Sequence, residues 1–202
     1  MKLIDENIYE KESFNMSGRT WVYSDPHFYH GNICKFEASP GVKLRPWDDA
    51  EQMTEDMIRW YNEMVDPGDR VYILGDVAFS PGKFRDVMSR LMGRKVLVPG
   101  NHEPRRFDKI CNDLGVEVRG YVVKKGFIMS HIPIHPGSLS RWQLNIHGHT
   151  HANNVEAGFV DYRGRSPTFG TKDDARYFCA CVEQTDFRPI LLDDILKERG
   201  LV

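Results

Sequence analysis

The chain has 202 residues, 41% of them hydrophobic and 28% charged, which is enough for one buried core and short for two. Its 27 Lys and Arg residues are balanced by 29 Asp and Glu residues, which argues against a dedicated binder of duplex DNA, because such proteins carry a strong basic excess. No apolar run approaches the roughly 18 residues that span a bilayer. The start lacks the apolar core of a secretory signal. The cysteines form no metal-binding or disulfide framework. We therefore expect a single cytoplasmic domain over residues 1–202, with no membrane partner.

Strand and helix patterns alternate along much of the chain. Short apolar runs that end at a glycine or proline predict buried strands, and apolar residues at helical spacing between them predict helices. In chain order we expect a strand at 20–23, a helix from Asp48, as its cap, to about Val65, a strand at 70–74, a helix at 81–92, a strand at 95–98, a helix at 104–114, strands at 127–129 and 144–146, and a helix at 192–199.

This order predicts α/β architecture, with a second sheet formed by the strands that dominate after Val116 and packed on the first. The carboxyl ends of such strands converge on one crevice, where open α/β sheets bind their ligands. Residues 152–176 are polar and show no clear periodicity, so we expect a long loop there.

Five short motifs, each with a carboxylate, an amide or a histidine, come directly after five of the predicted strands. They are Asp25-Pro26-His27, Gly75-Asp76, Gly100-Asn101-His102-Glu103, Ser130-His131-Ile132-Pro133 and Gly148-His149-Thr150-His151. Carboxylate oxygen and neutral imidazole together suit Mn, Fe, Zn, Co or Ni better than Ca. Asp76 is the best candidate to bridge two cations, which repel one another unless they share an anion. The motifs therefore indicate a two-metal hydrolytic site.

The series of motifs resembles the calcineurin-like metallophosphoesterase superfamily, whose pattern is D-x-H, G-D, G-N-H-D/E, H and G-H-x-H. Residues 25–33, 45–47 and 181–195 also resemble segments of its small bacterial and phage members. The resemblance implies a four-layer αββα sandwich, in which two mixed sheets are flanked by helices and a dinuclear site lies at the carboxyl ends of the strands. It also implies two divalent transition metal ions, for which we favour Mn over Fe, Zn, Ni, Co or Mg.

The resemblance further assigns a ligand set to each metal and a separate role to the remaining histidine. The first metal would be bound by Asp25, His27, Asp76 and His151, and the second by Asp76, Asn101, His131 and His149. A hydroxide that bridges the metals would attack phosphorus in line. His102 would protonate or stabilise the leaving oxygen, and Glu103 could orient His102 by accepting its other N–H.

Other side chains near the motifs are candidates for binding the substrate. His30 could line the site or be an ordinary loop histidine. Arg45 and Arg105 are mildly favoured to bind a phosphate, because the Arg fork matches phosphate geometry, although a single Arg is more often a solvated side chain. Trp142 and Tyr162 could stack a base, although loop aromatics often have no such role.

These features predict a metal-dependent phosphoesterase that hydrolyses a phosphomonoester or phosphodiester, with a small nucleotide or phosphorylated metabolite as the favoured substrate. A nuclease acting on DNA or RNA ends is the alternative, and it is not favoured, because no basic track is evident in the sequence. A different class is a non-catalytic metal-binding scaffold for protein interaction. It is less favoured, because scaffold members tend to lose ligands or the catalytic histidine, and this chain retains them all.

Overall fold

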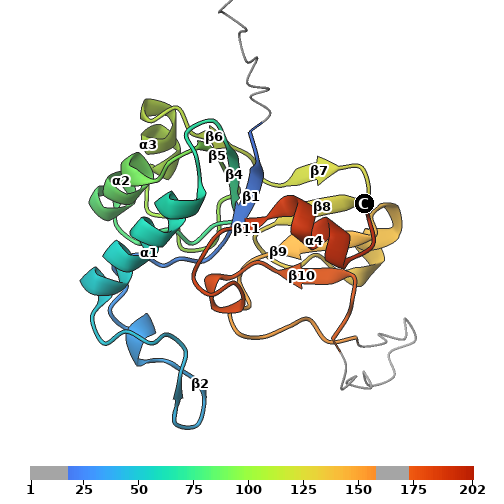
Figure 1. Cartoon of the computed structure of the whole chain (residues 1–202), viewed down its shortest axis with the longest axis horizontal. Coiled ribbons are helices and arrows are strands. Elements are labelled where there is room, and N and C mark those ends of the chain that lie inside the picture. The colour runs from blue at the N-terminus through green and yellow to red at the C-terminus, as the bar shows by residue number, and fades with distance from the viewer. Residues whose placement is uncertain (1–17, 158–172) are drawn as a thin grey trace, which may run out of the picture.

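The computed structural model describes residues 18–157 and 173–202 (Figure 1). Residues 158–172, which belong to the loop expected at 152–176 and include Tyr162, lie outside the described residues. The described part contains two main sheets and a small two-stranded one.

The first sheet has the strand order β11-β1-β4-β5-β6. Strands β1, β4, β5 and β6 are parallel, and β11 pairs antiparallel with β1. The strands are apolar runs because both faces are buried: Val22 and Tyr72 contribute to the core toward the second sheet, and Tyr23 and Ile73 to the core under the helices. The strands are β1 Thr20–Tyr23, β4 Arg70–Ile73, β5 Arg94–Leu97, β6 Glu117–Val118 and β11 Ile190–Leu191.

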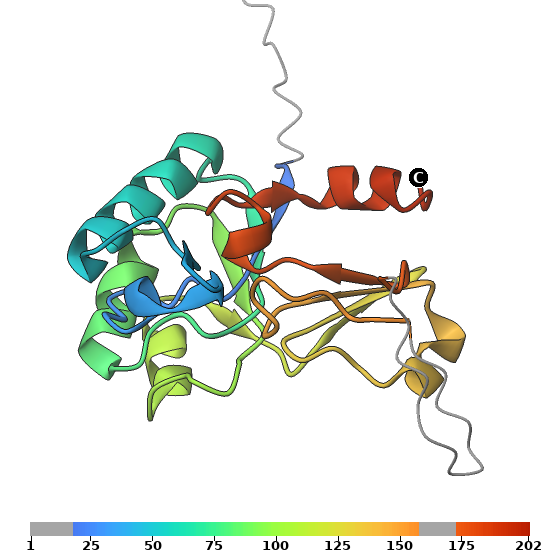
Figure 2. The same ribbon diagram turned by 90° about the horizontal axis from the view of Figure 1, so that it is seen from below.

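Three helices cover the outer face of the first sheet, and Figure 2 shows them gathered on one side of the molecule. The first helix begins after Asp49, whose carboxylate accepts a hydrogen bond from the Gln52 amide at 2.7 Å, so the cap lies one residue later than the expected Asp48. The third begins later than expected, because Arg106 adopts the left-handed conformation with φ of 63° and is its N-cap. The helices are α1 Ala50–Met64, α2 Pro81–Arg90 and α3 Phe107–Asp113.

A buried carboxylate, Asp69, holds the turn between α1 and β4. It accepts hydrogen bonds from the main-chain amides of Arg19 at 2.8 Å and Asp66 at 3.1 Å, and from the indole Nε1 of Trp21 at 2.8 Å. Because Arg19 and Trp21 come from the start of β1, Asp69 ties the beginnings of two neighbouring strands together.

The second sheet has the strand order β10-β9-β8-β7. Strands β8, β9 and β10 are parallel, and β7 pairs antiparallel with β8. Both main sheets are therefore mixed, and the expected α/β fold with two mixed sheets is confirmed. The strands are β7 Val122–Lys124, β8 Phe127–Ser130, β9 Leu144–His147 and β10 Tyr177–Cys179.

An apolar core fills the space between the two sheets. Val96 of the first sheet and Met129 and Ile146 of the second belong to it, and helix α4 (Leu192–Glu198) adds Ile195. The alternation of these residues with polar ones in β8 and β9 turns Ser130, Asn145 and His147 away from the core.

The outer face of the second sheet is covered by a short 3-10 helix, η2 (Pro136–Arg141). Leu139 of η2 packs against Ile128 and Tyr177, and Trp142 packs on the same cluster. Trp142 is thus half-buried against the sheet.

The remaining elements are short and lie near the carboxyl ends of the strands of the first sheet. They are the 3-10 helices η1 (Ile33–Lys35) and η3 (Val182–Gln184) and the hairpin of β2 (Glu37–Ser39) and β3 (Val42–Lys43), which projects from the body of the molecule in Figure 1. None of the helices in the described ranges combines the length and the apolar character needed to cross a bilayer.

Candidate metal centre

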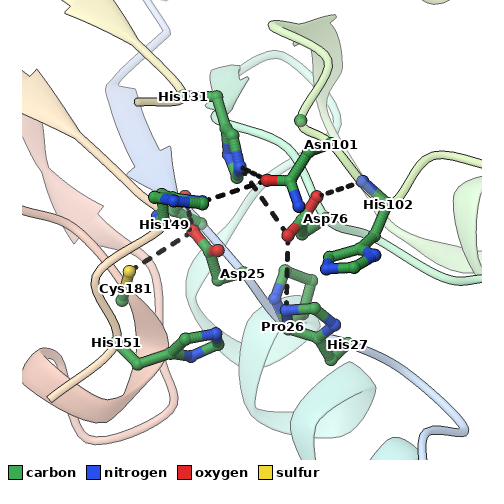
Figure 3. Close-up of polar contacts among 12 residues, drawn as sticks. Asp25, Pro26, His27, Asp76, Asn101, His102, His131, His149, His151 and Cys181 are labelled. Carbon is green, nitrogen blue, oxygen red and sulfur yellow. Dashed lines mark hydrogen bonds and ion pairs between the residues drawn. The ribbon is translucent and has the colours of Figure 1, made fainter. Parts of the chain in front are cut away.

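The loops that follow five parallel strands bring the predicted metal ligands together in one place (Figure 3). Strands β1, β4, β5, β8 and β9 each lead into one motif, so the fold explains why the motifs follow apolar runs. The gathered side chains are those of Asp25, His27, Asp76, Asn101, His131, His149 and His151.

Five of these seven residues have left-handed backbone conformations, which few non-glycine residues adopt. The φ angles are 55° for Asp25, 48° for His27, 53° for Asp76, 72° for His149 and 50° for His151. Such conformations are costly, and they persist where the surroundings impose them, most often at functional sites. Left-handed backbone is therefore concentrated at the positions that the motifs predict as ligands.

One oxygen of the buried Asp25 carboxylate is saturated with hydrogen bonds, and the other is free. Oδ2 accepts from the Ser24 hydroxyl, from the His149 amide at 2.9 Å and from the Cys181 thiol at 3.3 Å. Oδ1 is buried and has no partner among the described residues. Burial raises the pKa of Asp25, and a cation bound at Oδ1 would act in the opposite direction. Gly148 permits this packing, because a Cβ there would lie 2.2 Å from Oδ2.

The Asp76 carboxylate lies between the two groups of ligands. Its Oδ1 accepts a hydrogen bond from the His102 amide at 2.9 Å. Its Oδ2 lies 3.5 Å from His27 Nε2 and 3.7 Å from His131 Nε2. A single oxygen at similar distances from both histidines is suitably placed to be shared by two cations.

Around Asn101, three of the predicted ligand side chains contact one another through atoms that can bind a metal. His131 Nδ1 lies 2.7 Å from the Leu74 carbonyl, which can only accept, so Nδ1 carries a proton and Nε2 is the ring atom directed at the cluster. That Nε2 lies 2.8 Å from Asn101 Oδ1, and His149 Nδ1 lies 3.0 Å from the same oxygen. Amide oxygen and imidazole nitrogen are both metal ligands, so these three side chains could hold one cation together.

The second group of ligands is formed by Asp25, His27 and His151, which each offer one ligand atom within 4.8 Å of the others. The rings of His27 and His151 stack with their centroids 5.1 Å apart. Both nitrogens of His27 are buried without a hydrogen-bond partner among the described residues. Burial, and next the charge of Arg45, lowers the pKa of His27 to about 2, so the ring is neutral and can bind a metal.

His151 is oriented by a carboxylate that the sequence analysis did not single out. Its Nδ1 lies 3.0 Å from Glu183 Oε1, which directs Nε2 toward the ligand group. Burial acts to raise the pKa of Glu183, but the hydrogen bond from His151 and the charge of Arg45 outweigh it and hold the pKa below its ordinary value. The only indication of Glu183 in the sequence was the resemblance of residues 181–195 to a segment of the small members of the family.

Arg45 is buried behind the predicted metal ligands and is closed to solvent, which corrects its expected role in binding a phosphate. Its side chain is fully buried and donates to Glu183 Oε1 from Nε at 2.8 Å and from Nη2 at 2.6 Å. It also donates to the main-chain oxygens of Asp25 at 2.7 Å and Pro26 at 2.5 Å. Arg45 therefore connects the first motif to Glu183, which orients a histidine of the last motif.

Glu103 binds backbone and not the His102 ring, which corrects the expected orienting role. Its Oε2 accepts from the Gly100 amide at 2.7 Å. Burial, and then the charge of Asp76, raises the pKa of Glu103 to about 7. Glu103 thus stabilises the turn that carries Asn101 and His102.

The His102 residue is exposed, and its ring lies beside the cluster of predicted metal ligands. Its centroid is 5.8 Å from that of His27 and 4.9 Å from that of Phe79, an exposed aromatic residue that sequence analysis missed. His30 also lies at the site, with its ring centroid 4.5 Å from Phe79 and 5.7 Å from His27. Arg105, in contrast, is exposed and lines a groove between α2 and α3.

Comparison with known proteins agrees with this geometry. The profile of the family described as Calcineurin-like phosphoesterase matches residues 18–173. Uncharacterized protein MJ1445 of Methanocaldococcus jannaschii is 31% identical over 191 residues, covering 91% of this chain and 94% of that protein. The crystal structure of the protein of unknown function AQ665 from Aquifex aeolicus is 24% identical and superposes with a TM-score of 0.60, covering 90% of this chain and 99% of that chain. The likeness to AQ665 supports the fold alone.

Proposed function

Because the chain belongs to the calcineurin-like phosphoesterase family, we propose that it hydrolyses phosphoric esters with two divalent metal ions bound by the seven clustered side chains. The observation that supports this most is the set of buried ligand atoms that have no hydrogen-bond partner within residues 18–157 and 173–202, which are Asp25 Oδ1 and both nitrogens of His27. Buried polar atoms in this condition are costly, and a cation bound at Asp25 Oδ1 and at the unprotonated nitrogen of His27 would reduce that cost. Carboxylate, amide and imidazole ligands together accept Mn, Fe, Zn, Ni, Co or Mg, and of these we favour Mn, as the resemblance to the family did.

When bound, two such ions activate a water molecule and neutralise charge on the phosphoryl oxygens. The residues of the chain hold the geometry and move the proton. His102 is exposed next to the ligand His27 and donates a proton to the leaving oxygen. The hydrogen bond from the His102 amide to Asp76 fixes the loop that carries this histidine against the centre.

We favour a small phosphorylated substrate. A groove of about 490 Å³ lies beside His149 and His151 and is also lined by Phe36 and Leu44 of the segment around the β2–β3 hairpin. Grooves of this size suit small molecules, and an apolar wall would accommodate the organic part of an ester.

The test is hydrolysis of p-nitrophenyl phosphate and bis-p-nitrophenyl phosphate with Mn, Fe, Zn, Ni, Co or Mg added in turn. We expect metal-dependent turnover that a chelator abolishes. Asp76→Asn should lower turnover by more than the roughly 10–100-fold lost when a group behind a metal ligand is removed. The matched control is Asp48→Asn, since that carboxylate is 92% exposed. An absence of turnover of both esters with every metal would overturn the proposal and favour the scaffold.

A further inference from the structure

A groove between α2 and α3, which we call the basic groove, is lined by positively charged side chains. It has a volume of about 420 Å³, and Figure 1 shows its two helices side by side. Its lining includes Gly82, Arg85, Arg105, Arg106, Lys109 and Asp113. Four cations thus accompany one carboxylate, in a chain whose formal net charge is −2. Three of these cations come from residues 105–109, and the fold adds Arg85 of α2 to them.

Chain connectivity places the basic groove next to His102. The ring of Phe79 lies 4.9 Å from that of His102, and Phe79 precedes by two residues Pro81, which begins α2 and lines the groove. At the other wall, Arg105 follows His102 by three residues, so their Cα atoms are at most about 11 Å apart. Both walls of the groove therefore begin within a few residues of the His102 side of the predicted centre.

Most of the positive charge in the basic groove is not neutralised by the protein. Asp113 forms an ion pair with Arg85 at 2.6 Å. Across the described ranges, Arg105, Arg106 and Lys109 form no ion pair, and such cations raise the local potential and attract an anion. Helix α2 adds the positive end of its dipole, and a Cβ placed on Gly82 in its first turn would meet no atom within 4 Å, so this wall is open.

We infer that the basic groove binds a phosphate group carried by the leaving group of the substrate. The inference rests on the proposed function, because His102 marks the leaving-group side through its role as proton donor. Arginine forks bind phosphate oxygens bidentately, and Arg105 and Arg106 supply two of them at the groove wall. The substrate class is then a phosphodiester whose leaving group bears a second phosphate, as in a phosphorylated dinucleotide or the end of a nucleic acid strand.

The kinetic test compares kcat/KM for dithymidylate with that for dithymidylates bearing a terminal 5′ or 3′ phosphate. We expect at least one phosphorylated form to be favoured by about tenfold or more in the wild type. Arg105→Gln/Lys109→Gln should abolish this preference. The control Lys124→Gln/Lys125→Gln makes the same charge change at exposed positions near the β7–β8 turn and should retain it. If kcat/KM for dodecathymidylate is higher than that for the phosphorylated dithymidylates, the second phosphate belongs to a nucleic acid strand. If the two kcat/KM values are equal, it belongs to a small molecule. Both results support the subsite.

The binding test titrates inorganic pyrophosphate into the full chain in the presence of a chelator, with the fold checked by circular dichroism. Arg105→Gln/Lys109→Gln should bind at least about tenfold more weakly than the wild type and the lysine control. If no ester is hydrolysed by the wild type, the proposed function fails, while this titration still reports on the anion site. Suppose instead that esters are hydrolysed, but Arg105→Gln/Lys109→Gln and Lys124→Gln/Lys125→Gln have the same phosphate preference and the same pyrophosphate affinity. The inference about the basic groove is then overturned, and the proposed esterase function is unaffected.

Discussion

Replacing Arg45 by methionine should destabilise the metal-free protein by about 4 kcal/mol. The Arg45 side chain is 0% exposed and its partner Glu183 is 3% exposed. Methionine fills much of the same space but donates no hydrogen bond, so it leaves a buried carboxylate without its cation and two main-chain oxygens without donors. Removing one member of a buried ion pair costs about 3–5 kcal/mol, a large part of the roughly 5–15 kcal/mol by which domains are stable.

Urea unfolding followed by circular dichroism measures this change. With a denaturant dependence of about 2 kcal/mol per molar, a loss of about 4 kcal/mol lowers the midpoint by about 2 M. The matched control is Arg119→Met, because Arg119 is 58% exposed and pairs with Glu117 at the surface. Exposed ion pairs contribute at most about 1 kcal/mol, so the control should move the midpoint by less than about 0.5 M.

Two results would refute the reasoning about Arg45. The first is a midpoint for Arg45→Met that equals that of Arg119→Met, since the guanidinium would then not be buried and paired in solution. The second concerns Arg45→Met/Glu183→Gln, which removes both charges. This double variant should be less destabilised than the sum of its two single variants, and strict additivity would show that the two side chains do not interact.

Three further changes test other parts of the structure. Gly148→Ala places a Cβ 2.2 Å from the Asp25 carboxylate, so Mn affinity measured by calorimetry should fall by about tenfold or more, whereas Gly31→Ala, with no atom within 4 Å of the added Cβ, should not change it. His102→Ala should slow hydrolysis of phenyl phosphate, which has a poor leaving group, by about 10²–10⁴-fold, and p-nitrophenyl phosphate by less; equal losses on both would contradict the acid role. Burial acts to raise the pKa of Asp69, but the hydrogen bonds that its carboxylate accepts outweigh burial and lower the pKa. The stability that ionised Asp69 contributes is therefore complete above about pH 4 and is lost as the pH falls through the folded-state pKa. The difference in urea midpoint between wild type and Asp69→Asn should therefore narrow below about pH 4, and a difference that widens there would contradict this sign.

The strands and the motif positions were predictable because each depends on local sequence. An apolar run followed by a glycine is a local pattern, and the carboxyl ends of parallel strands meet whatever the details of packing. The shift of the α1 cap from Asp48 to Asp49 shows the limit of this approach. Both residues are aspartates that can cap a helix, and only the backbone conformation at Asp49, with φ of −118° and ψ of 129°, decides between them.

The contacts behind the predicted metal ligands could not be foreseen from the sequence, because they join segments that are far apart in the chain. Arg45 and Glu183 are separated by 138 residues, and nothing local distinguishes a buried arginine from one that faces a substrate. The predicted role of Glu103 was wrong for a related reason. Its position next to His102 suggested a bond between the two side chains, whereas the turn directs the carboxylate to the Gly100 amide. The basic groove was not predicted because its concave shape and the addition of Arg85 to the charges of residues 105–109 arise only when α2 packs beside α3.

The backbone of the motifs adds a physical reason why these residue types occur at these positions. Each left-handed non-glycine residue costs on the order of 1–3 kcal/mol, and glycine would avoid that cost but would supply no ligand. Aspartate and histidine are among the residues that tolerate the left-handed region best, and both are metal ligands. At Asp25, Asp76 and His149 one residue therefore meets a conformational and a chemical requirement together. Glycine is kept instead at Gly100 and Gly148, where a Cβ would collide with the carboxylates of Asp76 and Asp25.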